Sequence, residues 1–242
     1  MNTQANALEG QGLPPADRLS QAIQEYKTSP HTPELIDRTF QTVWSVWGES
    51  IGHSFDVPAC DRSSEELESL RTEGRGVLLV PDEVYTREGL ILLGRVFPKM
   101  NSWSVGEDTT VVNEHTGGGC IDVEMTVDAP YRTDRGYTEQ QLRDAIAADG
   151  REGQRVATYI VGSQISKLLT GRLFDKGSTS SRLPGSSDGG RTMGAYFAPN
   201  GYLHVSSNLD PQYQSPRLGG RSEGRHKANK TWVFDARSTG TS

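Results

Sequence analysis

Cysteine is scarce in this sequence: the 242 residues contain only two, Cys60 and Cys120. Two isolated thiols make neither a disulfide framework nor a zinc site, so we expect the chain to work in a reducing compartment. Long apolar runs are missing as well, and residues 1–15 contain neither a basic start nor an apolar stretch. The sequence therefore predicts no membrane span and no secretion signal, which leaves the cytoplasm as the default location and a virion as the alternative.

A surplus of positive charge is also missing. The formal net charge is -6, whereas dedicated nucleic-acid binders are usually basic, so we expect no nucleic-acid partner. The sequence contains no Gly-x-Ser-x-Gly elbow, no phosphate-binding glycine loop and no His or Cys cluster at metal spacing. We therefore expect no cofactor, no metal and no catalytic residue. Only 33% of residues are hydrophobic and 27 are glycine, so much of the chain is expected to be loop and turn.

The first third of the chain is predicted to be helical. Residues 1–13 are expected to form a disordered tail, and residues 14–75 a small helical segment. Within it, Thr32 before Pro33 predicts a helix start, and a capping box beginning at Ser63 predicts a short third helix. The second helix carries an apolar stripe that includes Trp44 and Trp47, and we interpret this stripe as core.

From residue 76 to the C-terminus we expect one mixed α+β domain. Residues 77–80 predict a buried strand, residues 87–96 a helix, and residues 103–108, 109–113 and 120–127 further strands. A capping box from Thr138 to Gln141 predicts a helix that stops at Gly150. Residues 155–169 predict another helix, and Gly162 marks a position where it can break.

A hairpin is predicted near the C-terminus, around the turn residues Pro199, Asn200 and Gly201. With that loop, Tyr196 pairs with His204. The flanking pairs are Phe197 with Leu203, Ala195 with Val205 and Ala198 with Tyr202. Because strand side chains alternate between faces, the apolar pairs share one face, and Tyr196 and His204 share the other. The hairpin is therefore expected to have one buried face and one face that is free to recognise a ligand.

Several motifs resemble one protein family. They are Ser-Arg-Leu-Pro-Gly-Ser at 181–186, Gly-Arg at 190–191, Phe197, Gly-Tyr-Leu at 201–203, Leu-Asp-Pro at 209–211 and, the most specific, Leu-Gly-Gly-Arg-Ser-Glu-Gly at 218–224. Residues 79–84, 127–130 and 166–171 match the same pattern, so the likeness covers residues 76–224. The sequence resembles the variable proteins of diversity-generating retroelements. One departure is Ser180, where many relatives carry tryptophan.

This resemblance implies a C-type lectin fold, of the type shared with formylglycine-generating enzymes, in residues 76–242. It also implies a variable region at about residues 181–224 that binds an unidentified macromolecular ligand, with protein as the expected class. The enzyme of related fold uses a pair of C-terminal cysteines, and this chain has no cysteine after Cys120. We therefore expect a binding protein and not an enzyme.

In such a family, template adenines are miscopied, so adenine-adenine-pyrimidine codons come to encode Asn, Tyr, Ser, Asp, His, Arg, Gly, Thr or several small apolar residues, but never a stop. Met193, Gln212 and Gln214 are outside that set and are expected to be fixed. The predicted ligand-binding residues are Ser187, Asp188, Arg191, Tyr196, Tyr202, His204, Ser206, Ser207, Asn208, Asp210, Tyr213, Ser215 and Arg217. Tyrosine gives such a surface a large contact area at low entropic cost, and serine and asparagine give adaptable hydrogen bonds.

Two other functions stay open from the sequence. His115 and Cys120 flank the glycine run 117–119, as a thiol nucleophile beside a base would, although no orienting third group is visible. A small buried side chain is the simpler interpretation of Cys120. The second alternative is a protein-interaction module that uses the helix with Trp44 and Trp47.

Overall fold

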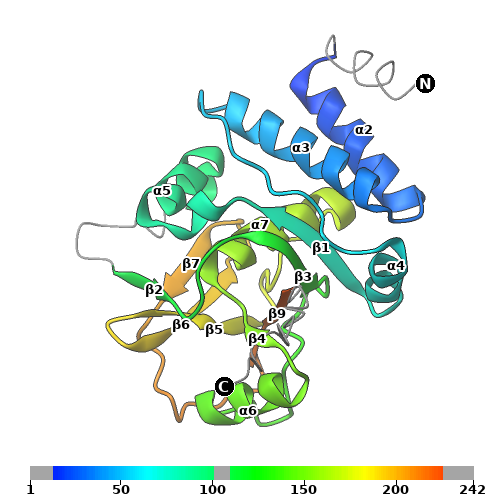
Figure 1. Ribbon diagram of the computed structural model, residues 1–242. Coiled ribbons are helices and arrows are strands. Elements are labelled where there is room, and N and C mark those ends of the chain that lie inside the picture. The colour runs from blue at the N-terminus through cyan, green and yellow to red at the C-terminus, as the bar shows by residue number, and fades with distance from the viewer. Residues whose placement is uncertain (1–12, 101–109, 226–242) are drawn as a thin grey trace, which may run out of the picture.

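The computed structural model describes residues 13–100 and 110–225 (Figure 1). This part of the chain contains both helices and strands, which confirms the mixed α+β composition. Residues 1–12 of the predicted disordered tail, the predicted strand at 103–108 and the end of the predicted domain after residue 225 lie outside the described residues. Within the described ranges, no helix combines the length and apolarity that crossing a membrane requires.

Three helices form the N-terminal part, and their starts agree with the sequence signals. They are α2 (Pro15–Thr28), α3 (Pro33–Glu49) and α4 (Ser64–Thr72). At the start of α3, the Leu35 backbone N–H donates to Thr32 Oγ1 at 3.3 Å. At the start of α4, the Glu66 N–H donates to Ser63 Oγ at 3.3 Å, and the Ser63 N–H donates to the Glu66 carboxylate at 2.8 Å. The predicted caps are therefore confirmed.

The apolar stripe of α3 lies in the core. Trp44 and Trp47 are only 1% and 7% exposed. The Trp44 indole N–H donates to the backbone carbonyl of Leu79 at 2.7 Å, and Trp47 packs edge-on against Phe97. The N-terminal helices thus share one hydrophobic core with the rest of the chain. Neither tryptophan is exposed to a partner, contrary to what the interaction-module alternative requires.

A four-stranded antiparallel sheet lies next to these helices (Figure 1). Its strands, in spatial order, are β1 (Arg75–Val80), β3 (Gly119–Glu124), β9 (Ser222–Arg225) and β4 (Glu152–Gly153). α3 and α4 pack on β1 from one side. The strand β3 ends at Glu124, three residues before the predicted end. The strand β9, at the end of the described residues, lies between β3 and β4 and is an inner strand of this sheet.

The helix α7 (Val156–Thr170) packs between this sheet and a second one. The prediction that this helix can break at Gly162 is wrong. The helix is continuous to Thr170, and its C-cap is Gly171, whose φ is 78°. A Cβ at Gly162 would lie 3.2 Å from Phe174 and 3.5 Å from Leu78 of β1. The glycine therefore permits close packing against the first sheet. On the second sheet, the Tyr159 ring stacks on Phe197 at 6.1 Å.

The second sheet has five strands. In order they are β2 (Val111–Asn113), β5 (Ser180–Asp188), β6 (Arg191–Phe197) and β7 (Leu203–Ser206), with β8 (Leu218–Gly220) parallel to β5. The remaining elements are η1 (Asp82–Tyr85), α5 (Arg87–Val96), η2 (Pro98–Met100) and α6 (Glu139–Ala148). The predicted bounds of α5 are confirmed. The capping box of α6 is confirmed by bonds of 3.2 and 3.0 Å between Thr138 and Gln141.

Candidate ligand-binding surface

The hairpin of β6 and β7 has the register that the sequence predicts. Tyr196 lies opposite His204, and Phe197 lies opposite Leu203. The loop is closed by a hydrogen bond of 2.8 Å from the Ala198 N–H to the carbonyl of Tyr202. The turn residues and the alternation of apolar and polar side chains were therefore enough to predict the strand pairing, without information about distant segments.

The two faces of this hairpin differ in exposure as expected. Phe197 and Leu203 are 1% and 0% exposed and face α7. On the other face Tyr196 is 40% exposed, and its ring stacks on His204 with centroids 4.9 Å apart and an interplanar angle of 9°. Tyr202, at the end of the turn, is 41% exposed. An aromatic pair with a third ring nearby is thus presented to solvent.

All thirteen predicted ligand-binding residues lie at the surface, and we call them the candidate surface. Four are half-buried, namely Ser187, Asp188, Ser207 and Ser215. Nine are exposed, namely Arg191, Tyr196, Tyr202, His204, Ser206, Asn208, Asp210, Tyr213 and Arg217. Met193, which the codon set excludes, is buried, whereas Gln212 and Gln214 are exposed between members of the surface. Exposure alone therefore does not separate the two glutamines from the candidate surface.

The loop at residues 207–217 lies across part of the outer face of the second sheet. A Cβ on Gly194 would lie 2.7 Å from Leu209 Cδ1, so the glycine makes room for this side chain. Arg182, only 1% exposed, donates from Nη2 to the carbonyls of Asp210 at 2.8 Å and Tyr213 at 3.0 Å. Burial lowers the pKa of Arg182, against the opposing effect of nearby Glu139.

The start of α6 holds the other side of this loop. The Glu139 backbone N–H donates to the carbonyl of Pro211 at 2.8 Å, and Gln214 Nε2 donates to Gln141 Oε1 at 3.2 Å. Gly136 has φ 77°, and a Cβ there would lie 2.4 Å from the carbonyl oxygen of Ser215. The loop is thus fixed in part through main-chain carbonyls. Two of its own side chains also contribute, because Asp210 Oδ1 accepts from the Gln212 N–H at 2.8 Å and Ser215 Oγ accepts from the Arg217 N–H at 3.2 Å.

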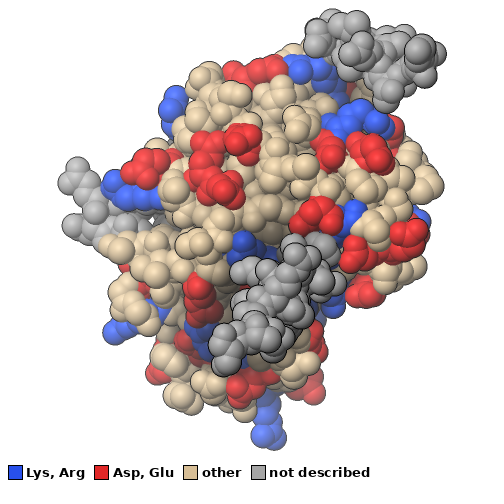
Figure 2. All heavy atoms as spheres, in the orientation of Figure 1, with Lys and Arg blue, Asp and Glu red and all other residues tan. Residues whose placement is uncertain are grey.

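The charges of the candidate surface are balanced. Its two arginines, Arg191 and Arg217, are equal in number to its two aspartates, Asp188 and Asp210. Asp188 also has a structural role, because its carboxylate accepts from the Thr110 N–H at 3.2 Å and from Ser207 Oγ at 3.4 Å. Basic and acidic side chains are interspersed over the face of the molecule drawn in Figure 2 as well. Aromatic and hydrogen-bonding groups, and not one sign of charge, therefore distinguish this surface.

Two contributors to this region could not be predicted from the sequence. Arg182 belongs to the motif at 181–186, but its role depends on the carbonyls of Asp210 and Tyr213, about thirty residues further along the chain. Val112, 54% exposed on β2, lies opposite Ser187 and extends the outer face of the sheet. No local pattern reports either contact, because both follow from how distant segments meet.

The motif at residues 218–224 proves to be framework. Arg221 is 1% exposed, donates from Nε to Asp175 Oδ2 at 3.2 Å, and lies 4.0 Å above the Phe174 ring. Cβ atoms at the glycines would collide with neighbours: at Gly220 one would lie 2.4 Å from Leu142, and at Gly224 one would lie 2.2 Å from Asp122. The motif therefore indicates how the two sheets are joined, not what the surface binds.

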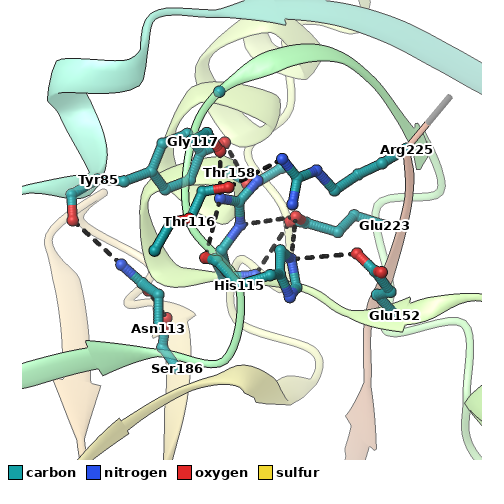
Figure 3. A network of polar contacts seen from close by, with 12 residues as sticks. Tyr85, Asn113, His115, Thr116, Gly117, Glu152, Thr158, Ser186, Glu223 and Arg225 are labelled. Atoms are coloured by element: carbon teal, nitrogen blue, oxygen red, sulfur yellow. Dashed lines mark hydrogen bonds and ion pairs between the residues drawn. The ribbon is translucent and has the colours of Figure 1, made fainter. Parts of the chain in front are cut away.

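Glu223, the acidic residue of this motif, is the centre of a buried polar network (Figure 3). Arg155 Nε donates to Glu223 Oε1 at 2.7 Å, and both side chains are 0% exposed. His115 Nε2 lies 2.9 Å from the same oxygen, and 3.4 Å from Glu152. Burial raises the pKa of Glu223, but the hydrogen bond with His115 and the charge of Arg155 outweigh it, so the pKa is lower than usual.

His115 and Cys120 belong to different contact networks. His115 is engaged by Glu223 and Glu152, whereas the thiol of Cys120 lies 3.7 Å from that of Cys60. The expectation of two isolated thiols is therefore wrong: chain folding brings together residues that are 60 positions apart. The contact with Cys60, together with burial, raises the pKa of the Cys120 thiol, which disfavours the thiolate that a nucleophile needs.

No group of three or more His, Cys, Asp or Glu side chains in the described ranges is arranged to hold a metal ion. No protein family, curated protein or solved structure matches the chain. The function of the candidate surface is therefore inferred from its geometry and from the sequence motifs.

Proposed function

We propose that this chain is a binding protein rather than an enzyme, and that it recognises a protein ligand through the candidate surface. We further propose that it is a variable protein of a diversity-generating retroelement with a C-type lectin-like fold. One observation carries the proposal: every position that the resemblance assigns to the variable set reaches solvent, while the alternating hairpin residues Ala195, Phe197 and Leu203 are buried.

The composition of the surface supports a role in recognition. Tyr196, Tyr202 and Tyr213 are 40%, 41% and 52% exposed, and they make up half of the exposed large hydrophobic side chains among the described residues. Tyrosine loses little entropy on binding and offers both a ring and a hydroxyl, so exposed tyrosines are typical anchors of engineered and natural paratopes. Surrounding Ser, Asn and Asp side chains supply adaptable hydrogen bonds.

The way the surface is held supports diversification. Arg182 binds the loop through the carbonyls of Asp210 and Tyr213, and Glu139 binds it through the carbonyl of Pro211. Every residue type offers the same carbonyl, so substitutions at the side chains leave these hydrogen bonds in place. Substitutions at exposed positions away from such anchors change stability little, and this is what a diversified surface needs.

A display library tests this proposal. In the first library, the nine exposed positions of the candidate surface carry the residue types that adenine mutagenesis yields. In the control library, the same residue types replace buried positions of β5, β6 and β7. Both are selected for protease resistance and then for binding to one stable test protein. We expect folded members and binders from the first library only. Equal loss of folding in both libraries, or no binder from the first, would contradict the proposal.

A further inference from the structure

The two cysteines of the chain lie side by side. Their sulfur atoms are 3.7 Å apart, although 60 positions separate the residues in the sequence. Cys60 lies in the segment that leads from α3 to α4, and Cys120 lies on β3. Cys60 is half-buried, whereas Cys120 is 5% exposed. Cys60 is therefore the more exposed residue of the pair, and Cys120 is the buried one.

The segment that carries Cys60 is held by two further contacts, one with α3 and one with β3. The Cys60 backbone N–H donates to Asp37 Oδ1 of α3 at 2.6 Å. Two residues later, Arg62 Nη2 donates to Asp122 Oδ1 at 2.7 Å, and both side chains of this ion pair are less than a tenth exposed. Cys120 and Asp122 point to the same face of β3 because strand side chains alternate. Cys60 and Arg62 thus contact successive positions of one strand face.

We propose that Cys60 and Cys120 are a thiol–disulfide site, which closes reversibly to an intramolecular disulfide. The sulfur atoms are 3.7 Å apart and need to approach by less than about 2 Å to reach bonding distance. This site is independent of the candidate surface, since it lies between the N-terminal helices and the first sheet.

The chemistry needs an oxidant, and a low-molecular-weight disulfide such as oxidised glutathione supplies it. The Cys60 thiolate attacks one sulfur of that disulfide and releases one glutathione thiolate, which leaves a mixed disulfide on Cys60. In this mixed disulfide Cys60 is no longer a thiolate, so the contact that contributes most to the raised pKa of Cys120 is removed. Cys120 then loses its proton, attacks Cys60 Sγ and displaces the second glutathione thiolate. Both protein thiols lose their protons, two glutathione thiols form, and the balance of electrons and atoms is complete. The hydrogen bond with Cys120 lowers the pKa of Cys60, which favours Cys60 as the first attacking group.

The disulfide would tie the segment before α4 to the sheet. It closes a loop of 60 residues, and a cross-link of that length removes much of the freedom of the unfolded chain. We expect the melting temperature of the oxidised chain to exceed that of the reduced chain by roughly 10 °C. Contact between the N-terminal helices and the first sheet thereby becomes dependent on redox state.

The test equilibrates the full chain in buffers that range from reduced to oxidised glutathione, followed by acid quenching, alkylation and peptide mass mapping. In oxidising buffers we expect a monomer that yields a Cys60–Cys120 cross-linked peptide and has the higher melting temperature. Dithiothreitol is expected to reverse both changes. Two freely alkylated thiols in native protein at every ratio would overturn the proposal. So would a glutathione adduct on Cys60 that does not proceed, or a disulfide-linked dimer.

A Cys60→Ser variant is the matched control. Since Cys60 is half-buried and serine has a similar size, the variant is expected to fold and to lose all dependence of its melting temperature on glutathione. A redox-dependent shift that persists in this variant would contradict the assignment to this pair. If the variant does not fold, mass mapping of the unmodified chain still decides the question.

Discussion

Arg182 contacts the loop at residues 207–217 through two main-chain carbonyls, those of Asp210 and Tyr213. Removal of the guanidinium leaves both carbonyls without this charged donor. We therefore expect Arg182→Met to lower the free energy of unfolding by about 2–3 kcal/mol, measured by urea denaturation. Arg172→Met, at an exposed arginine, is the control and is expected to have little effect. Equal effects of the two substitutions would show that Arg182 does not support the loop.

Tyr202 and Leu203 are neighbours in sequence with opposite environments, 41% and 0% exposed. We expect Tyr202→Ala to change the free energy of unfolding by less than about 0.5 kcal/mol, because the side chain is exposed and its removal leaves no cavity in the core. Leu203→Ala is expected to cost about 2–5 kcal/mol, because it leaves a cavity in the core. Thermal or urea unfolding of both variants tests the pair. A large loss with Tyr202→Ala would place this residue in the framework and remove it from the candidate surface.

Glu223 gives the chain a predictable dependence on pH. Its pKa in the folded chain is lower than the ordinary value of 4.5, so the stability it contributes is present above that value and is lost as the pH falls through the folded-state pKa. We expect Glu223→Gln to cost about 3–5 kcal/mol at neutral pH, because Arg155 is left buried without its partner. The variant should also lose less stability than the unmodified chain between about pH 5 and pH 3.

The control for this pH experiment is Glu88→Gln, which removes an exposed carboxylate. Urea unfolding at several pH values should give this control the same steep acid loss as the unmodified chain. An identical acid profile for Glu223→Gln would mean that Glu223 does not contribute to the pH dependence.

At the scale of elements, the backbone conformation of the hairpin turn favours glycine at position 201. Gly201 has φ 86°, in the left-handed region that an alanine side chain disfavours. We expect Gly201→Ala to destabilise the chain by about 1 kcal/mol. Gly94→Ala in α5 is the control, and we expect it to raise the stability. A Cβ at this position meets nothing within 4 Å, and alanine favours the helix over glycine. Thermal unfolding in which both variants move in the same direction would contradict this view of the turn.

Elements with local signals were predictable. Thr32, Ser63 and Thr138 begin helices because a side-chain oxygen at that position accepts an otherwise unpaired N–H. The register of the hairpin followed from a turn and from the alternation of its strands. These features depend on residues within a few positions of one another, so one sequence contains the information.

Elements that depend on distant segments were not predictable. The position of β9 between β3 and β4, and of β8 beside β5, depends on where the chain returns. The pair of Arg155 and Glu223 joins residues 68 positions apart, and a charged residue in a sequence normally indicates a surface, not a core. Nine of the thirteen residues of the candidate surface are exposed and four are half-buried, but the support of this surface by Arg182 and its extension by Val112 required the arrangement of the strands.

At the scale of the whole molecule, α7 packs between two sheets and the N-terminal helices cover the first of them (Figure 1). The buried networks around Glu223 and Arg221 join the C-terminal strand β9 to this core. The candidate surface lies on the outer face of the second sheet, away from the core-facing side chains of α7. The proposed diversification requires this separation of an exposed layer from the buried core.

The most direct test is to sequence the encoding locus and its surroundings in several isolates. The proposal predicts a nearby reverse transcriptase gene and an imperfect repeat of the 3′ coding region that differs at adenines. It also predicts amino-acid changes at members of the candidate surface such as Tyr202 and His204, with Arg182, Phe197 and Leu203 unchanged. A locus with neither gene nor repeat, and the same residues at Tyr202 and His204 in every isolate, would contradict the proposed function.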